Sequence, residues 1–232
     1  MARQTSWAIL LAVLSSALAQ TGCKICSCAE GSGVQMPGAT LAATPGAQGS
    51  SDALLGSEPY DWKNVAVLGG GFVTGVIFSP SVKGLVYART DVGGAYRRDP
   101  GSDAWIPLND SLSRDDSHYF GIESLALDPT DPERVYLASG LYTKGWAGNG
   151  AMLRSRDRGK TWDTKPMSIK MGGNEWGRSC GERLAVDPNQ PSRVLFGSRQ
   201  AGLLVSEDAG ESWTETAGLP KGTGNDPIGV TA

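Results

Sequence analysis

Short stretches in which apolar and polar residues alternate recur along the chain from about residue 60 onward. Three of them run directly into a Ser-Pro or Asp-Pro pair, and these are residues 74–78, 121–127 and 182–186. A second apolar stretch follows each Pro pair, at residues 85–88, 134–138 and 193–197. Alternation over four to eight residues that ends at Pro, Gly or Asp is typical of β-strands joined by tight turns. The pattern therefore predicts an all-β fold built from three similar units.

Each unit closes with a third strand, a turn and a Trp. Residues 155–162 read S-R-D-R-G-K-T-W and residues 206–213 read S-E-D-A-G-E-S-W. This is the Asp-box pattern of β-propellers: a short Asp side chain accepts backbone N–H bonds, and Gly adopts a positive φ. The first unit has a degenerate version that is one residue longer, at residues 97–105, with Asp99 in the Asp position.

The repeat length indicates the architecture. Four strands in roughly 50 to 60 residues are typical of one propeller blade, and three blades do not close a ring, which needs about four to eight. We therefore predict an incomplete β-propeller of about three four-stranded blades with Asp-box turns. Incomplete rings expose unpaired strand edges, so we expect the chain alone to be prone to aggregation.

Three segments with different compositions divide the chain. Residues 1–19 predict a signal peptide, with Arg3, an apolar core and an Ala-Leu-Ala cleavage site. Residues 20–58 predict a Cys-containing flexible linker that is poor in charge. Residues 59–232 are expected to be the N-terminal part of a truncated propeller domain. The protein is then expected to be secreted and extracellular, with no membrane association.

Charge and cysteine content narrow the function classes. The net charge is −3 and no basic block occurs, which argues against nucleic-acid binding. We expect no metal and no cofactor, because His118 is the single histidine and a C-x-x-C-x-C cluster alone makes a poor zinc site. In an exported protein disulfides are favoured, and the pairing stays open among Cys23, Cys26, Cys28 and Cys180.

One carboxylate differs from the repeated ones. In an antiparallel meander the Pro turns and Asp-boxes lie at one end of the blades. The long connections, at residues 107–120, 140–150 and 165–181, lie at the other end. Asp91 belongs to that second end. When the sequences of the first and third units are aligned, Gln200 occupies the position of Asp91. It either caps the turn at residues 92–94 or acts in catalysis.

Residues 89–97, R-T-D-V-G-G-A-Y-R, closely resemble the first-blade signature of glycoside hydrolase family 74. Further stretches resemble that family in the same order, at residues 69–75, 121–126, 148–154 and 177–188. The resemblance implies two seven-bladed propellers that face each other across a cleft for xyloglucan or a related β-1,4-glucan. It implies inverting hydrolysis with Asp91 as general base and a general acid in the second propeller, beyond this chain. The fragment alone is therefore expected to be inactive and the protein to be a monomer.

Aromatic and polar residues in the long connections are candidates for substrate binding. Trp146 and Trp176 could stack on sugar rings or pack on their own loops, and Tyr119 and Asn149 are weaker candidates of the same kind. Glu123 and Glu182 occupy similar positions in successive units, so we expect a scaffold role for both. Arg178 and Arg183 are their expected partners.

Two other functions remain open at this point. A sialidase also carries Asp-boxes, but it needs an arginine cluster and a Tyr nucleophile. A sortilin-like propeller binds carbohydrate or protein without catalysis and needs no unique carboxylate. Endo or reducing-end exo action stays open as well. Asn109-Asp110-Ser111 is an N-glycosylation acceptor in a eukaryotic secretory host.

Overall fold

A computed structural model describes residues 64–219 and residue 221. The expected signal peptide at 1–19, the linker at 20–58 and the cysteines Cys23, Cys26 and Cys28 lie outside the described residues. Within them, twelve β-strands and one short 3₁₀ helix, η1 (Ser117–Phe120), follow one another along the chain.

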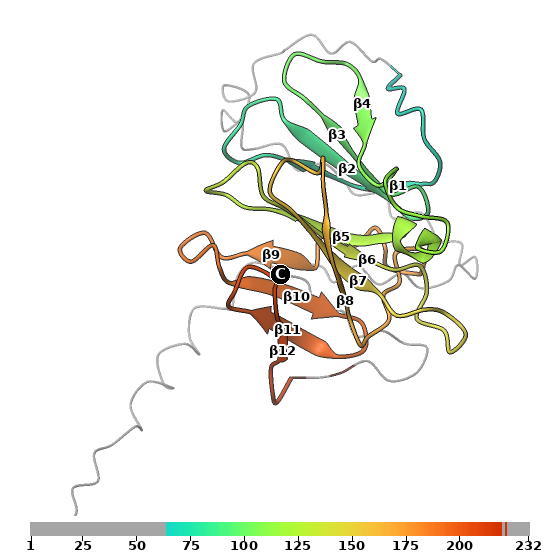
Figure 1. Ribbon diagram of the computed structural model, residues 1–232, viewed down its shortest axis with the longest axis vertical. Coiled ribbons are helices and arrows are strands. Elements are labelled where there is room, and N and C mark those ends of the chain that lie inside the picture. Colours follow the sequence, from blue (N-terminus) through green and yellow to red (C-terminus); the bar gives the residue numbers. More distant parts are fainter. Residues whose placement is uncertain (1–63, 220, 222–232) are drawn as a thin grey trace, which may run out of the picture. The chain divides into compact units, whose positions relative to one another are not determined.

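The strands form three four-stranded antiparallel sheets, each made of strands that are consecutive in sequence (Figure 1). The first sheet contains β1 (Val73–Phe78), β2 (Val86–Thr90), β3 (Ala95–Arg98) and β4 (Trp105–Pro107). The second contains β5 (Ile122–Leu127), β6 (Val135–Ser139), β7 (Ala151–Ser155) and β8 (Asp163–Pro166). The third contains β9 (Leu184–Val186), β10 (Val194–Ser198), β11 (Gly202–Ser206) and β12 (Thr214–Glu215). The predicted all-β meander of three repeated units is confirmed.

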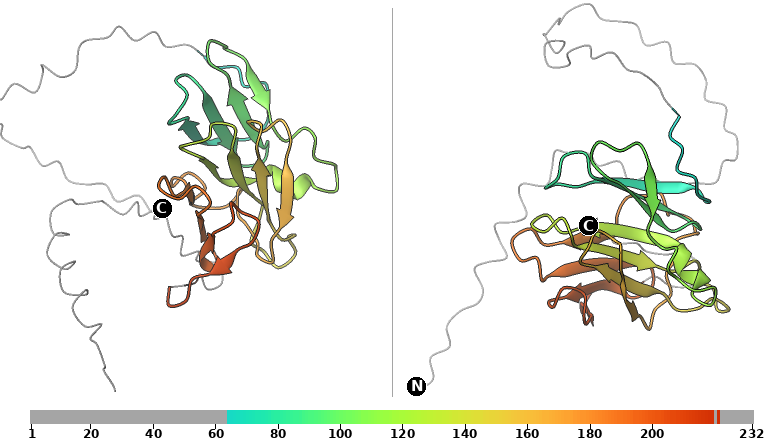
Figure 2. Two further views of the ribbon diagram at one scale, coloured as in Figure 1. Left: turned by 60° about the vertical axis from the view of Figure 1, so that its left-hand side comes forward. Right: turned by 45° about the horizontal axis from the view of Figure 1, so that its top comes forward.

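The sheets pack face to face in chain order, with the second between the other two (Figure 2). One apolar core lies between the first and second sheets and includes Tyr87, Leu125 and Leu137. A second core lies between the second and third sheets and includes Ala126, Tyr136 and Phe196. Neighbouring residues of β5 therefore face different cores, as the period of two along a strand requires. Strand β5 is buried because both of its faces are covered.

The two regular Asp-boxes close their turns with the same bonds. The Asp157 carboxylate accepts hydrogen bonds from the Ser155 hydroxyl at 2.7 Å and from the Thr161 amide and hydroxyl at 2.9 and 2.6 Å. Asp208 accepts the equivalent bonds from Ser206 and Ser212 at 2.8, 2.9 and 2.6 Å. These aspartates hold the turns that follow β7 and β11.

Asp99 follows β3 at the same end but makes different contacts. Its carboxylate accepts hydrogen bonds from Arg97 at 2.8 and 3.1 Å. In this turn Arg97 stands in the Asp-box Ser position. The Arg97 guanidinium also donates to the Arg158 carbonyl in the Asp-box of the second sheet at 2.6 Å. Asp99 therefore orients an arginine that joins two sheets.

Asp91 lies at the opposite end of the first sheet from Asp99. It directly follows β2, whereas Asp99 directly follows the antiparallel neighbour β3. The long connections meet at the end that carries Asp91: Gly94 donates to the Phe120 carbonyl at 2.8 Å, and Asn174 donates to the Leu141 carbonyl at 3.0 Å. The structure thus separates Asp91 from the Asp-box carboxylates.

Candidate functional site

The turn that carries Asp91 is held by its neighbour Thr90. The Thr90 hydroxyl accepts the Gly93 amide at 2.9 Å and donates to the Gly94 carbonyl at 2.8 Å. Gly93 is required because a Cβ there would lie 1.9 Å from the Gly70 carbonyl oxygen, and Gly94 has a φ of 81°. Capping of this turn therefore falls to Thr90, and the Asp91 side chain is directed to other partners.

The Asp91 carboxylate is nearly buried and has a different partner on each oxygen. Its side chain is 10% exposed. Oδ1 accepts the Phe72 amide at 2.7 Å, and the Asp91 amide donates back to the Phe72 carbonyl at 3.1 Å. Oδ2 faces Nε of Arg178 at 3.3 Å in an ion pair. The carboxylate is thus held by the segment before β1 and by the connection between β8 and β9.

A buried arginine fixes the connection that supplies Arg178. Arg89, two residues before Asp91, is fully buried and donates to the carbonyls of Arg178 and Gly181 at 2.9 and 3.0 Å. Its Nε donates to Glu182 at 2.6 Å. Glu182 in turn accepts the Leu125 amide of β5 at 2.7 Å. Arg89 of the first sheet therefore anchors the segment that leads into β9 of the third sheet.

The second predicted scaffold carboxylate makes an analogous pair. Glu123 and Arg199 are both fully buried, and the Arg199 Nε donates to Glu123 at 2.6 Å. Glu123 also faces Arg183 at 3.6 Å and accepts the Gly172 amide at 2.7 Å. The scaffold role of both glutamates is visible in these contacts. Of the partners expected for them, Arg183 pairs with Glu123, whereas Arg178 pairs with Asp91.

A cavity of about 310 Å³ opens beside Arg178. It is lined by Tyr142, Lys144, Asn174, Glu175, Trp176, Arg178 and Arg199. The residues come from the connections between β6 and β7 and between β8 and β9, and from the position directly after β10. The Arg178 side chain therefore borders this cavity and also contacts the Asp91 carboxylate.

The four residues expected to bind substrate lie in different surroundings. Trp146 and Trp176 are each 75% exposed, and the Trp146 ring lies 5.2 Å from the Tyr142 ring between centroids. Asn149 is exposed in the same connection as Trp146. Tyr119 is buried in the core between the first and second sheets, with its ring centroid 4.0 Å from that of His118. Only Trp176 of these four lines the cavity beside Arg178.

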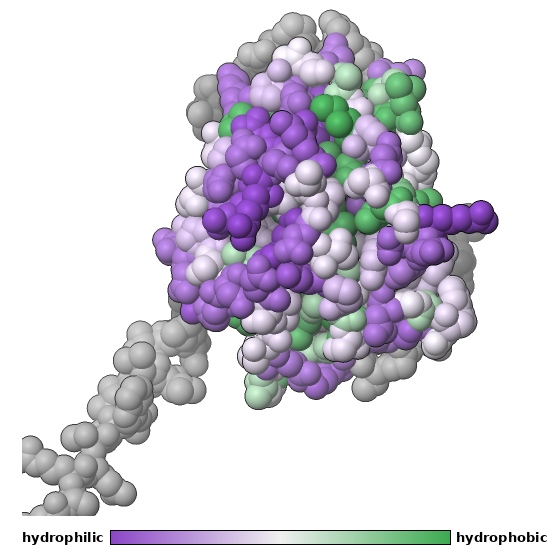
Figure 3. Space-filling model, viewed as in Figure 1, coloured by the Kyte–Doolittle hydropathy of each residue, from purple (hydrophilic) through white to green (hydrophobic). Residues whose placement is uncertain are grey.

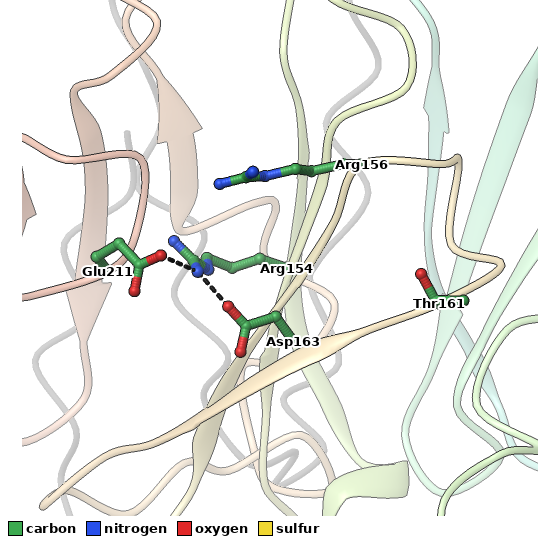
Figure 4. Close-up of a pocket in the computed structure, with 5 residues that line it drawn as sticks. All are labelled: Arg154, Arg156, Thr161, Asp163 and Glu211. Carbon is green, nitrogen blue, oxygen red and sulfur yellow. Dashed lines mark hydrogen bonds and ion pairs between the residues drawn. The ribbon is translucent and has the colours of Figure 1, made fainter.

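A second cavity, of about 340 Å³, lies at the Asp-box end of the second and third sheets (Figure 4). Arg154 reaches across it to Asp163 and Glu211, and Lys165 pairs with both carboxylates. Hydrogen bonds from Arg154 lower the pKa of Asp163 and of Glu211. Because these charges neutralise one another across two sheets, we interpret this cavity as an inter-sheet contact.

The described residues contain no candidate metal site and no candidate membrane-spanning helix. In this part of the chain, no cluster of His, Cys, Asp and Glu could hold a metal ion. No helix among the described residues is long and apolar enough to cross a membrane.

Known proteins resemble the chain over most of its length. No family model matches it. A Paenibacillus xyloglucanase is 54% identical over 167 residues, which are 71% of this chain and 16% of the relative. The oligoxyloglucan-reducing end-specific xyloglucanase of Emericella nidulans is 45% identical over 194 residues, 82% of this chain and 24% of the relative. The chain thus spans about a fifth of the length of these curated relatives.

The solved structures agree with the sequence relatives. The GH74 xyloglucanase of Xanthomonas campestris matches with a TM-score of 0.64 and 51% identity, over 70% of this chain and 23% of that chain. The GH74 enzyme of Niastella koreensis matches with a TM-score of 0.63 and 42% identity. The three sheets are therefore part of a β-propeller of the kind found in glycoside hydrolases. The chain belongs to glycoside hydrolase family 74, the family of these xyloglucanases, over the region that it shares with them.

Three contacts of the site could not be read from the sequence. The partners in the pairs Asp91–Arg178, Arg89–Glu182 and Glu123–Arg199 lie far apart in the chain; Arg89 and Glu182, for example, are 93 residues apart. The role of Thr90 had a local signal, because a Thr three residues before Gly can bond that residue's amide.

Proposed function

We propose that this chain is the part of a secreted, inverting xyloglucan hydrolase that supplies the general base, Asp91. The observation that carries the proposal is the position of this carboxylate. Asp91 is held at the loop end of the first sheet, away from the Asp-boxes, in a chain related to xyloglucanases. The Asp-box aspartates Asp157 and Asp208 are engaged in closing their own turns.

The contacts of Asp91 suit proton abstraction from water. An ionised carboxylate offers about four acceptor directions, and the Phe72 amide takes one of them on Oδ1. The Arg178 Nε faces Oδ2 without a hydrogen bond in the described part of the chain, so Oδ2 keeps its acceptor capacity. In inverting hydrolysis a base of this kind activates water, and an acid about 6.5–9.5 Å away protonates the leaving oxygen.

The proposal assigns the general acid to a part of the protein outside residues 1–232, as the family resemblance implies. The isolated chain is then expected not to hydrolyse xyloglucan. The proposal covers both endo action and reducing-end exo action.

The exposed aromatic residues support a polysaccharide as the substrate. Trp146 and Trp176 leave most of their indole surface in solvent, at the end of the sheets that carries Asp91. Large exposed aromatic planes of this kind are enriched at binding sites. We assign sugar stacking to these two residues and hydrogen bonding to the exposed Asn149. The burial of Tyr119 favours a supporting role beneath the site.

The test is hydrolysis of xyloglucan by the full-length protein, with the product anomer followed by ¹H NMR. The wild type is expected to release the α-anomer first, because inversion at a β-linkage requires it. Asp91→Asn is expected to lower kcat roughly 10²- to 10⁴-fold, the usual contribution of a general base. The matched control is Asp115→Asn, at an exposed aspartate in the connection between β4 and β5. Its kcat should equal that of the wild type.

Two outcomes contradict the proposal. One is release of the β-anomer, which indicates a retaining mechanism. The other is an Asp91→Asn variant as active as the wild type. A protein that binds xyloglucan without cleaving it supports the binding-only function instead.

A further inference from the structure

Asp91 and Arg178 form an ion pair although they belong to connections of different sheets. Asp91 lies in the turn between β2 and β3, and Arg178 lies in the connection between β8 and β9. Their ion pair spans 3.3 Å from Nε to Oδ2. We propose that Arg178 is a positioning residue that holds the Asp91 carboxylate in the orientation needed to accept a proton from water. The inference rests on the proposed role of Asp91.

The two oxygens of Asp91 are held from different directions. The torsion that turns a carboxylate about its last bond is broad, so a contact to one oxygen leaves the group free to rotate. The Phe72 amide binds Oδ1 at 2.7 Å, and the Arg178 charge attracts Oδ2. Loss of Arg178 therefore leaves the carboxylate held at Oδ1 alone and in a less defined orientation.

Arg178 is itself held near the carboxylate. Its guanidinium carbon lies 5.7 Å above the centre of the Phe72 ring, and its NH1 donates to the Glu175 carbonyl at 3.3 Å. Phe72 thus contacts both members of the pair, the carboxylate through its amide and the guanidinium through its ring. The Arg178 side chain is 31% exposed, so its charge remains partly solvated and its replacement leaves no deep cavity.

Arg89 anchors the backbone of the connection through contacts that do not involve the Arg178 side chain. Arg89 binds the carbonyls of Arg178 and Gly181 and the carboxylate of Glu182. Replacing the Arg178 side chain leaves all three of these contacts in place. A substitution there should therefore act mainly on Asp91, since it removes from the connection itself only the 3.3 Å bond to the Glu175 carbonyl.

The experiment is a double-mutant cycle in the full-length protein, with kcat and KM measured on xyloglucan. Arg178→Met keeps an unbranched side chain and removes the charge. We expect it to lower kcat roughly 10²-fold, the cost of about 1 Å of misplacement at a reacting group. KM should change less than about threefold, because the contact does not bind substrate uniformly. In the Asp91→Asn background the same substitution should cause no further loss, because it acts through the missing carboxylate.

Two variants serve as controls. Arg114→Met removes an equal charge from an exposed residue in the connection between β4 and β5, and its kcat should match that of the wild type. Arg178→Lys keeps a charge and should recover part of the lost kcat, although lysine lacks the planar guanidinium. Thermal unfolding shows whether each variant is folded. If Arg178→Met does not fold, the cycle is run with Arg178→Lys.

The inference is overturned if Arg178→Met retains the wild-type kcat. Equal losses in the wild-type and Asp91→Asn backgrounds also overturn it, and so does an effect confined to KM. Failure of the proposed function looks different: in that case Asp91→Asn itself remains active.

Discussion

At the scale of single residues, hydrogen bonds within each Asp-box turn lower the pKa of its aspartate. Hydrogen bonds from the Ser212 hydroxyl and amide and from the Ser206 hydroxyl lower the pKa of Asp208 from 3.8 to about 2. Burial alone raises the pKa of Asp157, but bonds from Thr161 and Ser155 outweigh it and lower that pKa to about 2. The ionised form of each carboxylate is thus favoured in the folded protein.

A depressed pKa links stability to pH in a defined direction. The contribution of Asp208 is fully present above its unfolded pKa of 3.8 and is lost as the pH falls through about 2. The difference in unfolding free energy between wild type and Asp208→Asn should therefore shrink from pH 4 to pH 2. Urea titrations at several pH values measure it, and Asp157→Asn should give the same window. A difference that stays constant over this range contradicts the assignment.

Asn109 shows how a sequence motif can differ from an accessible site. Its side chain is buried, its Oδ1 accepts the Ala95 amide at 2.8 Å, and its Nδ2 is buried as well. Nδ2 is the atom to which a glycan would be attached, so the folded protein cannot present Asn109 as an acceptor. Its role is to hold the start of β3.

At the scale of elements, buried Arg–Glu pairs connect the sheets. Glu123 of β5 and Arg199, which follows β10, are both fully buried. Removing one partner of such a pair leaves an uncompensated buried charge. The sheets therefore depend on these pairs as well as on their apolar cores.

Glu123→Gln is expected to lower the unfolding free energy by about 3–5 kcal/mol, the usual cost of breaking a buried pair. The matched control is Glu207→Gln, which breaks an exposed pair with Arg193 and should cost no more than about 1 kcal/mol. Urea denaturation measures both. Equal losses of unfolding free energy in the two variants would show that burial of the Glu123–Arg199 pair does not increase its contribution to stability.

Much of the element order was predictable, because strands and turns depend on local patterns. The alternation before each Pro pair located β1, β5 and β9 to within a few residues, and the S-x-D-x-G motif located the turns after β7 and β11. The contacts of Asp99 with Arg97 and the partners of Asp91 were not predictable. They depend on arginines that reach across sheets, such as Arg97 and Arg178, and no local pattern indicates such contacts.

At the scale of the whole molecule, two apolar side chains of β1 are exposed on the face of the first sheet that is turned away from the second sheet. By strand register Val76 occupies the position of Leu125 and Phe78 that of Leu127. Leu125 is buried against the preceding sheet, whereas Val76 and Phe78 are 50% and 71% exposed. In the view of Figure 3 the hydrophobic residues form small groups among hydrophilic ones. The apolar side chains of β1 thus stand where another sheet would pack.

Exposed apolar side chains on a strand of a sheet promote association. We expect residues 1–232 expressed alone to self-associate, and Val76→Thr with Phe78→Thr to reduce this, since both changes keep β-forming residues. Sedimentation velocity at several concentrations measures the effect. Val92→Thr, at an exposed apolar residue of the Asp91 turn, is the control and should not change it. A chain that is monomeric at every concentration contradicts this expectation.

The most direct test of the account compares two aspartates from opposite ends of the sheets. The measurement is kcat on xyloglucan for the full-length wild type, Asp91→Asn and Asp208→Asn, at a pH above 5 where both variants are folded. The account predicts a loss of roughly 10²- to 10⁴-fold for Asp91→Asn and near wild-type turnover for Asp208→Asn. Equal turnover in the two variants would contradict it.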